Sequence, residues 1–200
     1  MEKAINIKSA SNEDEEQILS VLFASFAHDP YMAYLLELSN NPNKLDILIR
    51  YITQQTLAKG RAYLTDDHKS TALWLTQRKE KFTWRFIKRN LNIYQKLGIK
   101  SIVRILKMEH ISHKRFPSKS PFMYLYMIGV MPEKQGKGYA GALLDTALAD
   151  ADAQACPVFL ETASELNVRI YEKKGFSVTH TFRDGNFMVF YMVRNPLLKE

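Results

Sequence analysis

The chain has 200 residues, 46% of them hydrophobic, and one domain of this length buries about two-thirds of the surface that the unfolded chain exposes. No apolar run is long enough to span a membrane, and a lone cysteine, Cys156, excludes an intramolecular disulfide. The net charge of +7 is unevenly distributed. Residues 1–7 show a mixed strand pattern without an apolar signal core, so we expect a single cytoplasmic domain over residues 1–200 with no membrane partner.

The first part of the chain predicts three helices and a hairpin. Ser11 is an N-cap residue, and Pro30 disfavours helical backbone at the residue before it, so one helix is expected between them. Apolar residues at helical spacing, followed by Gly60, predict a longer helix. In chain order we expect a strand at residues 4–8, helices at residues 11–26, 31–38 and 44–59, and hairpin strands at residues 61–65 and 71–76.

A basic helical insert is expected at residues 78–119. It contains thirteen lysines and arginines but two acids, so it carries +11 and the remaining chain −4. Helices are predicted at residues 82–97 and 99–113, the second with an apolar face formed by Ile99, Ile102, Val103 and Leu106. The charge is compatible with a solvated face, with attraction of a phosphate-bearing or acidic ligand, or with nucleic-acid binding. Charged helix faces are usually only solvated, so nucleic acid is the less favoured partner.

The remaining chain predicts strands that alternate with helices. An almost continuous apolar strand at residues 123–130 leads through a glycine-containing loop into an Ala/Leu-rich helix at residues 138–153. Further elements are a strand at residues 158–161, a helix at residues 167–174, and two closing strands at residues 176–182 and 187–193 that turn at Asp184-Gly185.

The loop before the helix at residues 138–153 is the most informative segment. It consists of Gln135, Gly136, Lys137, Gly138, Tyr139 and Ala140. A glycine-rich turn that opens a helix presents unpaired backbone N–H groups at the positive end of the helix dipole, which suits phosphate oxygens. Neither a mononucleotide P-loop nor a dinucleotide fingerprint fits the glycine spacing. The loop is therefore interpreted as a pyrophosphate cradle, with a purely structural turn as the alternative.

Two segments resemble the GCN5-related N-acetyltransferase (GNAT) superfamily. Gln135, Gly138 and Ala140 fill its pattern Gln/Arg-x-x-Gly-x-Gly/Ala, and Val130, Pro132 and Leu143-Leu144 match the flanks. Residues 159–162 and 167–176 look like the later family motif, in wording closest to the branch that includes puromycin acetyltransferase. The resemblance implies a mixed α/β fold with a central, mostly antiparallel sheet and a splayed parallel strand pair flanked by helices. Residues 123–176 would then form the acetyl-CoA-binding core.

The resemblance also implies roles for single residues. Residues 135–140 would hold the pyrophosphate of acetyl-CoA, and the backbone of Ile128 and Val130 would pair with the pantetheine arm. Tyr171 would return a proton to the departing thiolate, the alternative being an aromatic side chain that only packs. Asn167, one helical turn earlier, would bind the pantetheine amides unless it is only an N-cap.

Two departures from the family pattern leave the general base unassigned. Ser164 stands where many members carry an asparagine, and the strand at residues 123–130 contains no acid. Tyr126 and Glu161 are the nearest polar candidates, each with a structural alternative. The resemblance also implies that Phe26, Asp29, Tyr31 and the insert at residues 78–119 would line the acceptor side.

The predicted function is acetyl transfer from acetyl-CoA to the primary amine of a small molecule, in a chain that related enzymes suggest could form a homodimer. The alternative is a CoA-binding module that has lost catalysis and uses its basic insert for regulation or nucleic-acid binding. No metal is expected, because the pair His110 and His113 has no carboxylate or cysteine partner in the sequence.

Overall fold

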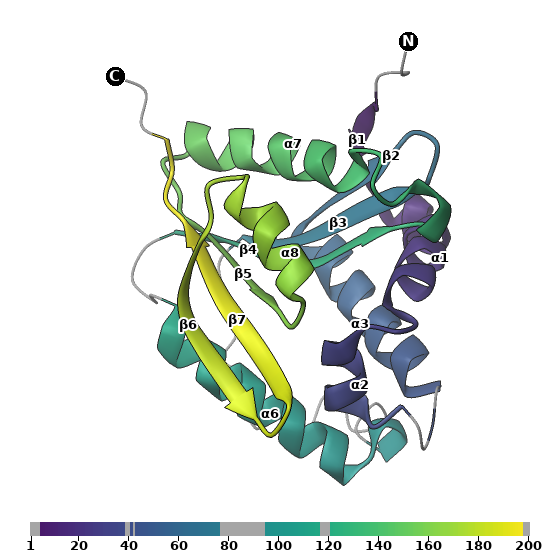
Figure 1. Cartoon of the computed structure of the whole chain (residues 1–200). Helices are drawn as coiled ribbons and strands as arrows, with labels where there is room; N and C mark the ends of the chain where they lie inside the picture. The colour runs from purple at the N-terminus through teal and green to yellow at the C-terminus, as the bar shows by residue number, and fades with distance from the viewer. Residues whose placement is uncertain (1–4, 39–40, 42, 77–94, 117–120, 198–200) are drawn as a thin grey trace.

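A computed structural model describes residues 5–38, 41, 43–76, 95–116 and 121–197 and places a seven-stranded sheet at the centre (Figure 1). The strand order is β1-β2-β3-β4-β5-β7-β6; β4 and β5 are parallel, and the other neighbours are antiparallel. The expected mixed, mostly antiparallel sheet is therefore confirmed. The strands are β1 (Ile7–Ser9), β2 (Arg61–Thr65), β3 (Ser70–Thr76), β4 (Met123–Val130), β5 (Val158–Thr162), β6 (Ser177–Asp184) and β7 (Phe187–Arg194).

Helices cover both faces of this sheet. They are α1 (Glu15–Phe26), α2 (Pro30–Leu36), α3 (Asn43–Lys59), α6 (Ile99–Arg115), α7 (Tyr139–Ala153) and α8 (Glu165–Glu172), with short 3-10 turns at Asn12–Asp14 and Pro132–Lys134. In Figure 1, α6 runs beneath the β6–β7 hairpin and lies next to α2, whereas α8 lies between α7 and β5. None of the helices in the described part of the chain is long and apolar enough to cross a membrane.

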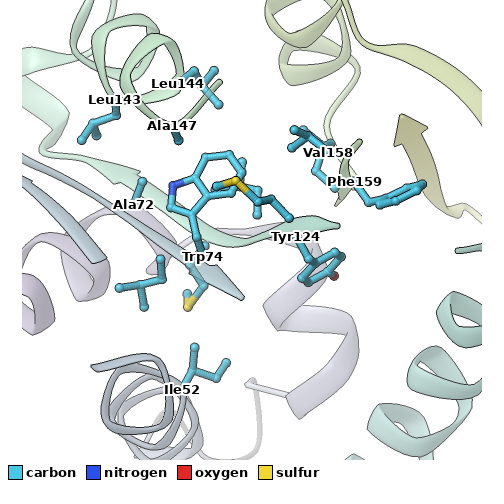
Figure 2. Packing of buried hydrophobic residues seen from close by; sticks show 14 of the residues in the cluster. Ile52, Ala72, Trp74, Tyr124, Leu143, Leu144, Ala147, Val158 and Phe159 are labelled. Carbon is cyan, nitrogen blue, oxygen red and sulfur yellow. The ribbon is translucent and has the colours of Figure 1, made fainter. Parts of the chain in front are cut away.

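The core is centred on Trp74, whose side chain is fully buried in β3. Figure 2 shows Leu143 and Ala147 of α7 on one side of this strand and Ile52 of α3 on the other. The apolar stripes of both helices therefore pack against opposite faces of one strand, which accounts for the nearly continuous burial of β3. Helices α3 and α7 thus hold β3 between them at the centre of the molecule.

The parallel pair β4–β5 separates after three residues. Met123 to Leu125 pair with Val158 to Leu160, and no pairing to β5 follows for the rest of β4. On its other edge β4 pairs with β3 as far as Val130, with a register shift opposite Leu73 and Trp74 that leaves Tyr126 as the extra residue. A bulge bends its strand and increases the local twist. The bend thus lies where β4 leaves β5, and it opens a gap between the two strands.

Helix α1 approaches the end of β4 closely. A Cβ atom at Gly129 would lie 2.8 Å from Ser25 Oγ, so the strand needs glycine at this position. The Ser25 hydroxyl donates to the carbonyls of Val21 and Val130, with Oγ–O distances of 2.7 and 3.0 Å. This contact fixes α1 beside the open edge of β4.

Most predicted elements are confirmed within one or two residues, and β4 is confirmed at both ends. The first strand differs, because it covers Ile7–Ser9 and not residues 4–8. The predicted helix at residues 82–97 lies outside the described residues except for 95–97.

The apolar face predicted for the second insert helix is wrong at Ile99 and Val103, although Ile102 packs against the core. Ile99 and Val103 are 81% and 59% exposed, whereas Ser101, Met108 and Ser112 are buried. Two small hydroxyl side chains thus face inward at helical spacing, and both donate hydrogen bonds there, Ser101 to the Leu36 carbonyl and Ser112 to Glu161. A hydropathy pattern places the opposite face of the helix inside, because it treats every serine as solvent-facing. It does not register that a buried serine hydroxyl can find a hydrogen-bond acceptor.

Candidate active site

One cavity of about 720 Å³ extends from the start of α7, past the open edge of β4, to the helices α2, α3 and α6. Its lining includes Gly136 and Gly138 at one end, Tyr171 and Asn167 on α8, and the acid Asp29. The cavity therefore connects the predicted cradle with the predicted acid and with the expected acceptor side.

The cradle has the backbone that the sequence predicts. Gly136 and Gly138 have φ angles of +74° and +83°, which favour glycine, and Gly138 is the N-cap of α7. No side-chain cap closes this end of α7 in the described part of the chain, so the N–H groups of the first turn remain available to an anion. A Cβ atom at Gly136 would meet nothing within 4 Å, so the loop leaves room for a ligand. These features fit a pyrophosphate.

The side chains of the cradle contribute unequally. Lys134, which the sequence analysis did not single out, lines the cavity and lies 5.5 Å from the ring centre of Tyr139. Lys137 is exposed, and its ammonium group donates to the Glu133 carbonyl at 3.0 Å without lining the cavity. Gln135 donates to the Val130 carbonyl at 3.2 Å. The predicted phosphate contact of Lys137 stays a prediction, and Lys134 is the better placed cation.

The carbonyl of Val130 is already engaged by two donors, Ser25 and Gln135. A pantetheine arm along β4 would therefore have to displace one of these donors or use other backbone groups of the strand. Ile128 and Val130 are half-buried and both line the cavity. Their predicted backbone pairing with the cofactor stays a prediction.

Helix α8 brings Asn167 and Tyr171 to the same side of the cavity. Ser164 is the N-cap of this helix, and its hydroxyl accepts from the Asn167 N–H at 3.3 Å. The N-cap alternative for Asn167 is therefore wrong, and the side chain of Asn167 lines the cavity. Ser164 therefore has a structural role as the cap of α8.

Tyr171 lines the cavity although its side chain is only 6% exposed. Its ring meets Phe176 edge-on at 5.8 Å, so the packing alternative and the catalytic one are compatible. Burial, and then the charge of Asp29, raise the pKa of the Tyr171 phenol. The phenol is therefore protonated throughout the physiological range and can serve only as a proton donor there.

Asp29 is the carboxylate coupled most directly to Tyr171. It is the N-cap of α2, and its Oδ1 accepts from the Met32 N–H at 2.8 Å. Burial raises the pKa of Asp29, against the lowering effect of hydrogen bonds from the N–H groups of Met32 and Tyr31. An acid with a raised pKa in a cavity is a candidate proton acceptor. Sequence reasoning placed Asp29 only on the acceptor side.

Glu161 accepts hydrogen bonds from hydroxyl groups on three other elements. It accepts from Tyr31 on α2 at 2.8 Å, from Tyr124 on β4 at 2.9 Å, and from Ser112 on α6 at 2.5 Å. Burial and the negative charge of Glu161 raise the pKa of Tyr31 well above its ordinary value. Glu161 therefore joins the walls of the cavity. The donors lie 37 to 130 residues away in sequence, so no local pattern predicts this cluster.

Tyr126 lines the cavity, as does Ile128 on the same strand. The described residues contain no group of three or more His, Cys, Asp or Glu side chains that could hold a metal ion. Cys156 is buried, and burial raises the pKa of its thiol, in line with a packed side chain.

Comparisons with known proteins agree with this geometry. The sequence profile of the family described as "Acetyltransferase (GNAT) family" matches residues 61–176. An uncharacterized N-acetyltransferase of Schizosaccharomyces pombe is 23% identical, over 94% of this chain and 83% of that protein.

Solved structures show the same fold. A Corynebacterium glutamicum protein described as "histone acetyltransferase HPA2 and related acetyltransferase" superimposes with a TM-score of 0.72 at 21% identity, over 98% of this chain and 99% of the other. Arylalkylamine N-acetyltransferase 2 from Aedes aegypti gives 0.73 at 14% identity, over 96% and 99%.

Proposed function

The chain belongs to the acetyltransferase (GNAT) family, and on this premise we propose that it transfers an acetyl group from acetyl-CoA to the primary amine of a small molecule. The observation that carries the proposal is that Gly138 of the cradle, Tyr171 and Asp29 line one shared cavity. A phosphate site, a proton donor and a proton acceptor thus open into one space. The similarity to an arylalkylamine N-acetyltransferase is consistent with an amine acceptor.

Direct attack in a ternary complex requires both substrates to be bound together. The reaction forms a C–N bond to the acetyl carbon and breaks the C–S bond, so the nitrogen loses a proton and the sulfur gains one. The bound thioester supplies the acetyl group. The cradle, Lys134 and the open edge of β4 would hold the cofactor with its thioester toward α8, where Asn167 could bind a pantetheine amide.

Asp29 is the residue that we propose as the proton acceptor. Amines are cationic near neutral pH, so the acceptor must lose a proton before it can attack. A carboxylate within the cavity attracts the ammonium form, and the raised pKa of Asp29 makes it a stronger base than an exposed aspartate. The family pattern of an acid on β4 is absent here, and Asp29 supplies the missing acid from α2.

Tyr171 is the residue that we propose as the proton donor to sulfur. The phenol is protonated in the resting site, and the electrostatic coupling to Asp29 connects the two groups. A proton taken up at Asp29 weakens the negative field at Tyr171 and makes its phenol a better donor. The two residues would therefore act in sequence on one transfer.

The test combines binding with turnover. We expect acetyl-CoA to bind much more tightly than ATP by titration calorimetry, and a panel of amines to stimulate CoA release. Tyr171→Phe is expected to lower kcat by about 10²–10⁴-fold, the usual contribution of a positioned acid, while the Kd of acetyl-CoA is unchanged. Tyr34→Phe is the matched control, because Tyr34 bonds Asp184 at the surface and does not line the cavity.

Two results would contradict the proposal. Equal turnover by Tyr171→Phe and wild type would remove Tyr171 from catalysis. Acetyl-CoA binding without turnover of any amine, together with salt-sensitive binding of nucleic acid, would favour the alternative of a binding module.

A further inference from the structure

Helix α7 begins at the cradle and carries a largely buried ion pair near its other end, where the end of β7 lies beside it (Figure 1). Arg194 of β7 is 6% exposed, and its guanidinium donates two hydrogen bonds to the Asp152 carboxylate, at 2.7 and 2.8 Å. The Leu197 N–H donates to the same carboxylate at 2.8 Å. A two-point contact between guanidinium and carboxylate fixes orientation as well as distance, so β7 is joined to α7 in one geometry.

The same guanidinium also reaches the turn that ends α8. Its Nε donates to the Lys174 carbonyl at 3.1 Å, and a Cβ atom at Gly175, whose φ is +85°, would lie 3.5 Å from this nitrogen. The turn closes on Tyr171, because the Tyr171 carbonyl accepts from the N–H groups of Lys174 and Phe176 at 2.9 and 3.1 Å. Arg194 is thus connected through Lys174 to the residue proposed as the proton donor.

The three bonds of Arg194 require the shape of a guanidinium group. Its donors lie in one planar fork, so Nε can bind the Lys174 carbonyl while the two terminal nitrogens bind Asp152. A lysine ammonium group is a point charge without this fork. The hydrogen bonds from Arg194 lower the pKa of Asp152, so the pair stays ionised at neutral pH.

A second contact between the end of α8 and α7 is exposed. The Lys174 ammonium group donates to the Asp145 carboxylate at 2.6 and 2.7 Å, and the Asp145 side chain is 62% exposed. Exposed ion pairs contribute little to stability. Loss of this pair would leave the bond between the Lys174 carbonyl and Arg194 in place. The two contacts therefore offer a matched comparison on the same pair of helices.

We infer that Arg194 is a positioning residue for Tyr171, whose phenol it places relative to the cradle through Asp152 and the Lys174 carbonyl. This inference rests on the proposed function and adds a residue to it. Gly138 and Asp152 belong to one helix and lie about 21 Å apart along its axis. A thioester held by its pyrophosphate at the start of α7 would thus meet a phenol whose helix is anchored at the far end. A displacement of about 1 Å at a reacting group can lower the rate about 10²-fold.

Arg194→Lys separates positioning from charge. Lysine keeps a positive charge beside Asp152 and loses the bond to the Lys174 carbonyl, so kcat is expected to fall about tenfold or more. The Kd of acetyl-CoA and the KM of the amine should change by less than about twofold, because the cradle and the acceptor side are untouched. Asp152→Asn weakens the same contact from α7 and should lower kcat by a smaller factor, so the test does not depend on the stability of one variant. Asp145→Asn is the control and should keep the kcat of wild type.

A double-mutant cycle with Tyr171→Phe shows whether Arg194 acts through Tyr171. Once the phenol is removed there is nothing left to position, so Arg194→Lys should lower the residual kcat of Tyr171→Phe by less than about twofold. A merely structural role would lower kcat by the same factor in both backgrounds, and this result would overturn the inference. Wild-type kcat in both Arg194→Lys and Asp152→Asn, beside an impaired Tyr171→Phe, would overturn it as well and leave the proposed acetyl transfer intact.

Hydrogen exchange gives a reading that does not depend on turnover. The N–H groups of Lys174 and Phe176, which bond to the Tyr171 carbonyl, should exchange about tenfold faster or more in Arg194→Lys and at the wild-type rate in Asp145→Asn. Unchanged exchange in Arg194→Lys would overturn the inference. Faster exchange, together with a wild-type protein that releases no CoA from acetyl-CoA with any amine, would overturn the proposed function and support the anchoring of Tyr171 by Arg194.

Discussion

Asp29 combines two roles that make opposite demands on one side chain. As N-cap of α2 it accepts a backbone hydrogen bond. As a carboxylate within the cavity it is partly removed from water, and this burial raises its pKa. The folded protein therefore holds the proton of Asp29 more tightly than the unfolded chain does, so stability falls as pH rises from the ordinary value of 3.8 through the raised pKa. Above the raised pKa, the free-energy cost of burying the ionised carboxylate of Asp29 is fully present.

Asp29→Asn should separate these roles. Asparagine caps helices as well as aspartate does, and it carries no charge, so the variant should be at least as stable as wild type at pH 7 by thermal unfolding. Its kcat/KM for an amine is expected to fall about 10²-fold or more through loss of the proton acceptor. A variant that is destabilised but fully active would contradict both roles.

The pH profile provides a second reading of the same residue. In wild type, kcat/KM should decrease as pH falls through the raised pKa of Asp29, because the protonated acid cannot accept the ammonium proton. In Asp29→Asn the decrease of kcat/KM that follows protonation of Asp29 should be absent. Only the pH dependence caused by protonation of the amine substrate should remain. The profile is measured with one amine at saturating acetyl-CoA, and an unchanged acid limb would assign that limb to another group.

At the scale of secondary-structure elements, the start of α7 offers a matched comparison. Gly136 in the cradle and Gly185 in the β6–β7 turn both have positive φ, at +74° and +59°, and a Cβ atom at either would meet nothing within 4 Å. The backbone strain of a substitution is therefore similar at both, about 1 kcal/mol. The two positions differ in that Gly136 lines the cavity.

Gly136→Glu is therefore expected to weaken acetyl-CoA binding at least about tenfold, because its carboxylate would stand where the phosphates are proposed to bind. Gly185→Glu should leave the Kd unchanged at a similar loss of stability. Calorimetric titration of both variants checks this. Equal affinities would show that the loop is only a structural turn.

Glu161 holds four elements together, and its removal should be visible in stability and in acceptor binding alike. Hydrogen bonds to a charged group contribute about 1.5–3 kcal/mol, and glutamine can replace only part of this set. Glu161→Gln is expected to lower the free energy of unfolding by about 2 kcal/mol and Tm by about 4–8 °C, with a higher KM for the amine and little change in the Kd of acetyl-CoA.

The control for Glu161→Gln is Glu172→Gln at an exposed position of α8, which should change neither Tm nor KM. A double-mutant cycle with Tyr31→Phe measures the coupling directly. Additive effects of the two substitutions would show that the 2.8 Å contact between Tyr31 and Glu161 contributes nothing.

At the scale of the whole molecule, the fold was largely predictable because its signals are local. The apolar run of β4, the glycine turn and the Ala/Leu stripe of α7 are each read from neighbouring residues in the sequence. The buried side of α6 was not predictable, since it depends on Ser101 and Ser112 finding partners on α2 and β5. The same holds for the catalytic proposal for Asp29, which depends on burial by distant segments.

The sheet itself is divided by the gap that forms the cavity. Only Met123–Leu125 of β4 pair with β5, so three residue pairs connect the half containing β1 to β4 with the half containing β5 to β7. A ligand that fills the gap would contact β4 on one side and α8, which packs on β5, on the other. Acetyl-CoA should therefore stabilise the connection between the halves and not only the cradle.

This leads to a prediction for the whole chain. At 100 times its Kd, acetyl-CoA should stabilise the protein by about 2.7 kcal/mol, which corresponds to a rise in Tm of about 5–11 °C. Hydrogen exchange should slow at residues 126–130, at residues 136–142 and along α8, while strand β2 and the edge strand β6, which lie away from the gap, change little. Slower exchange confined to residues 136–142 would mean that the ligand binds only through its phosphates. In that case the gap between β4 and β5 would not be the path of the pantetheine arm, and the thioester would not reach Tyr171.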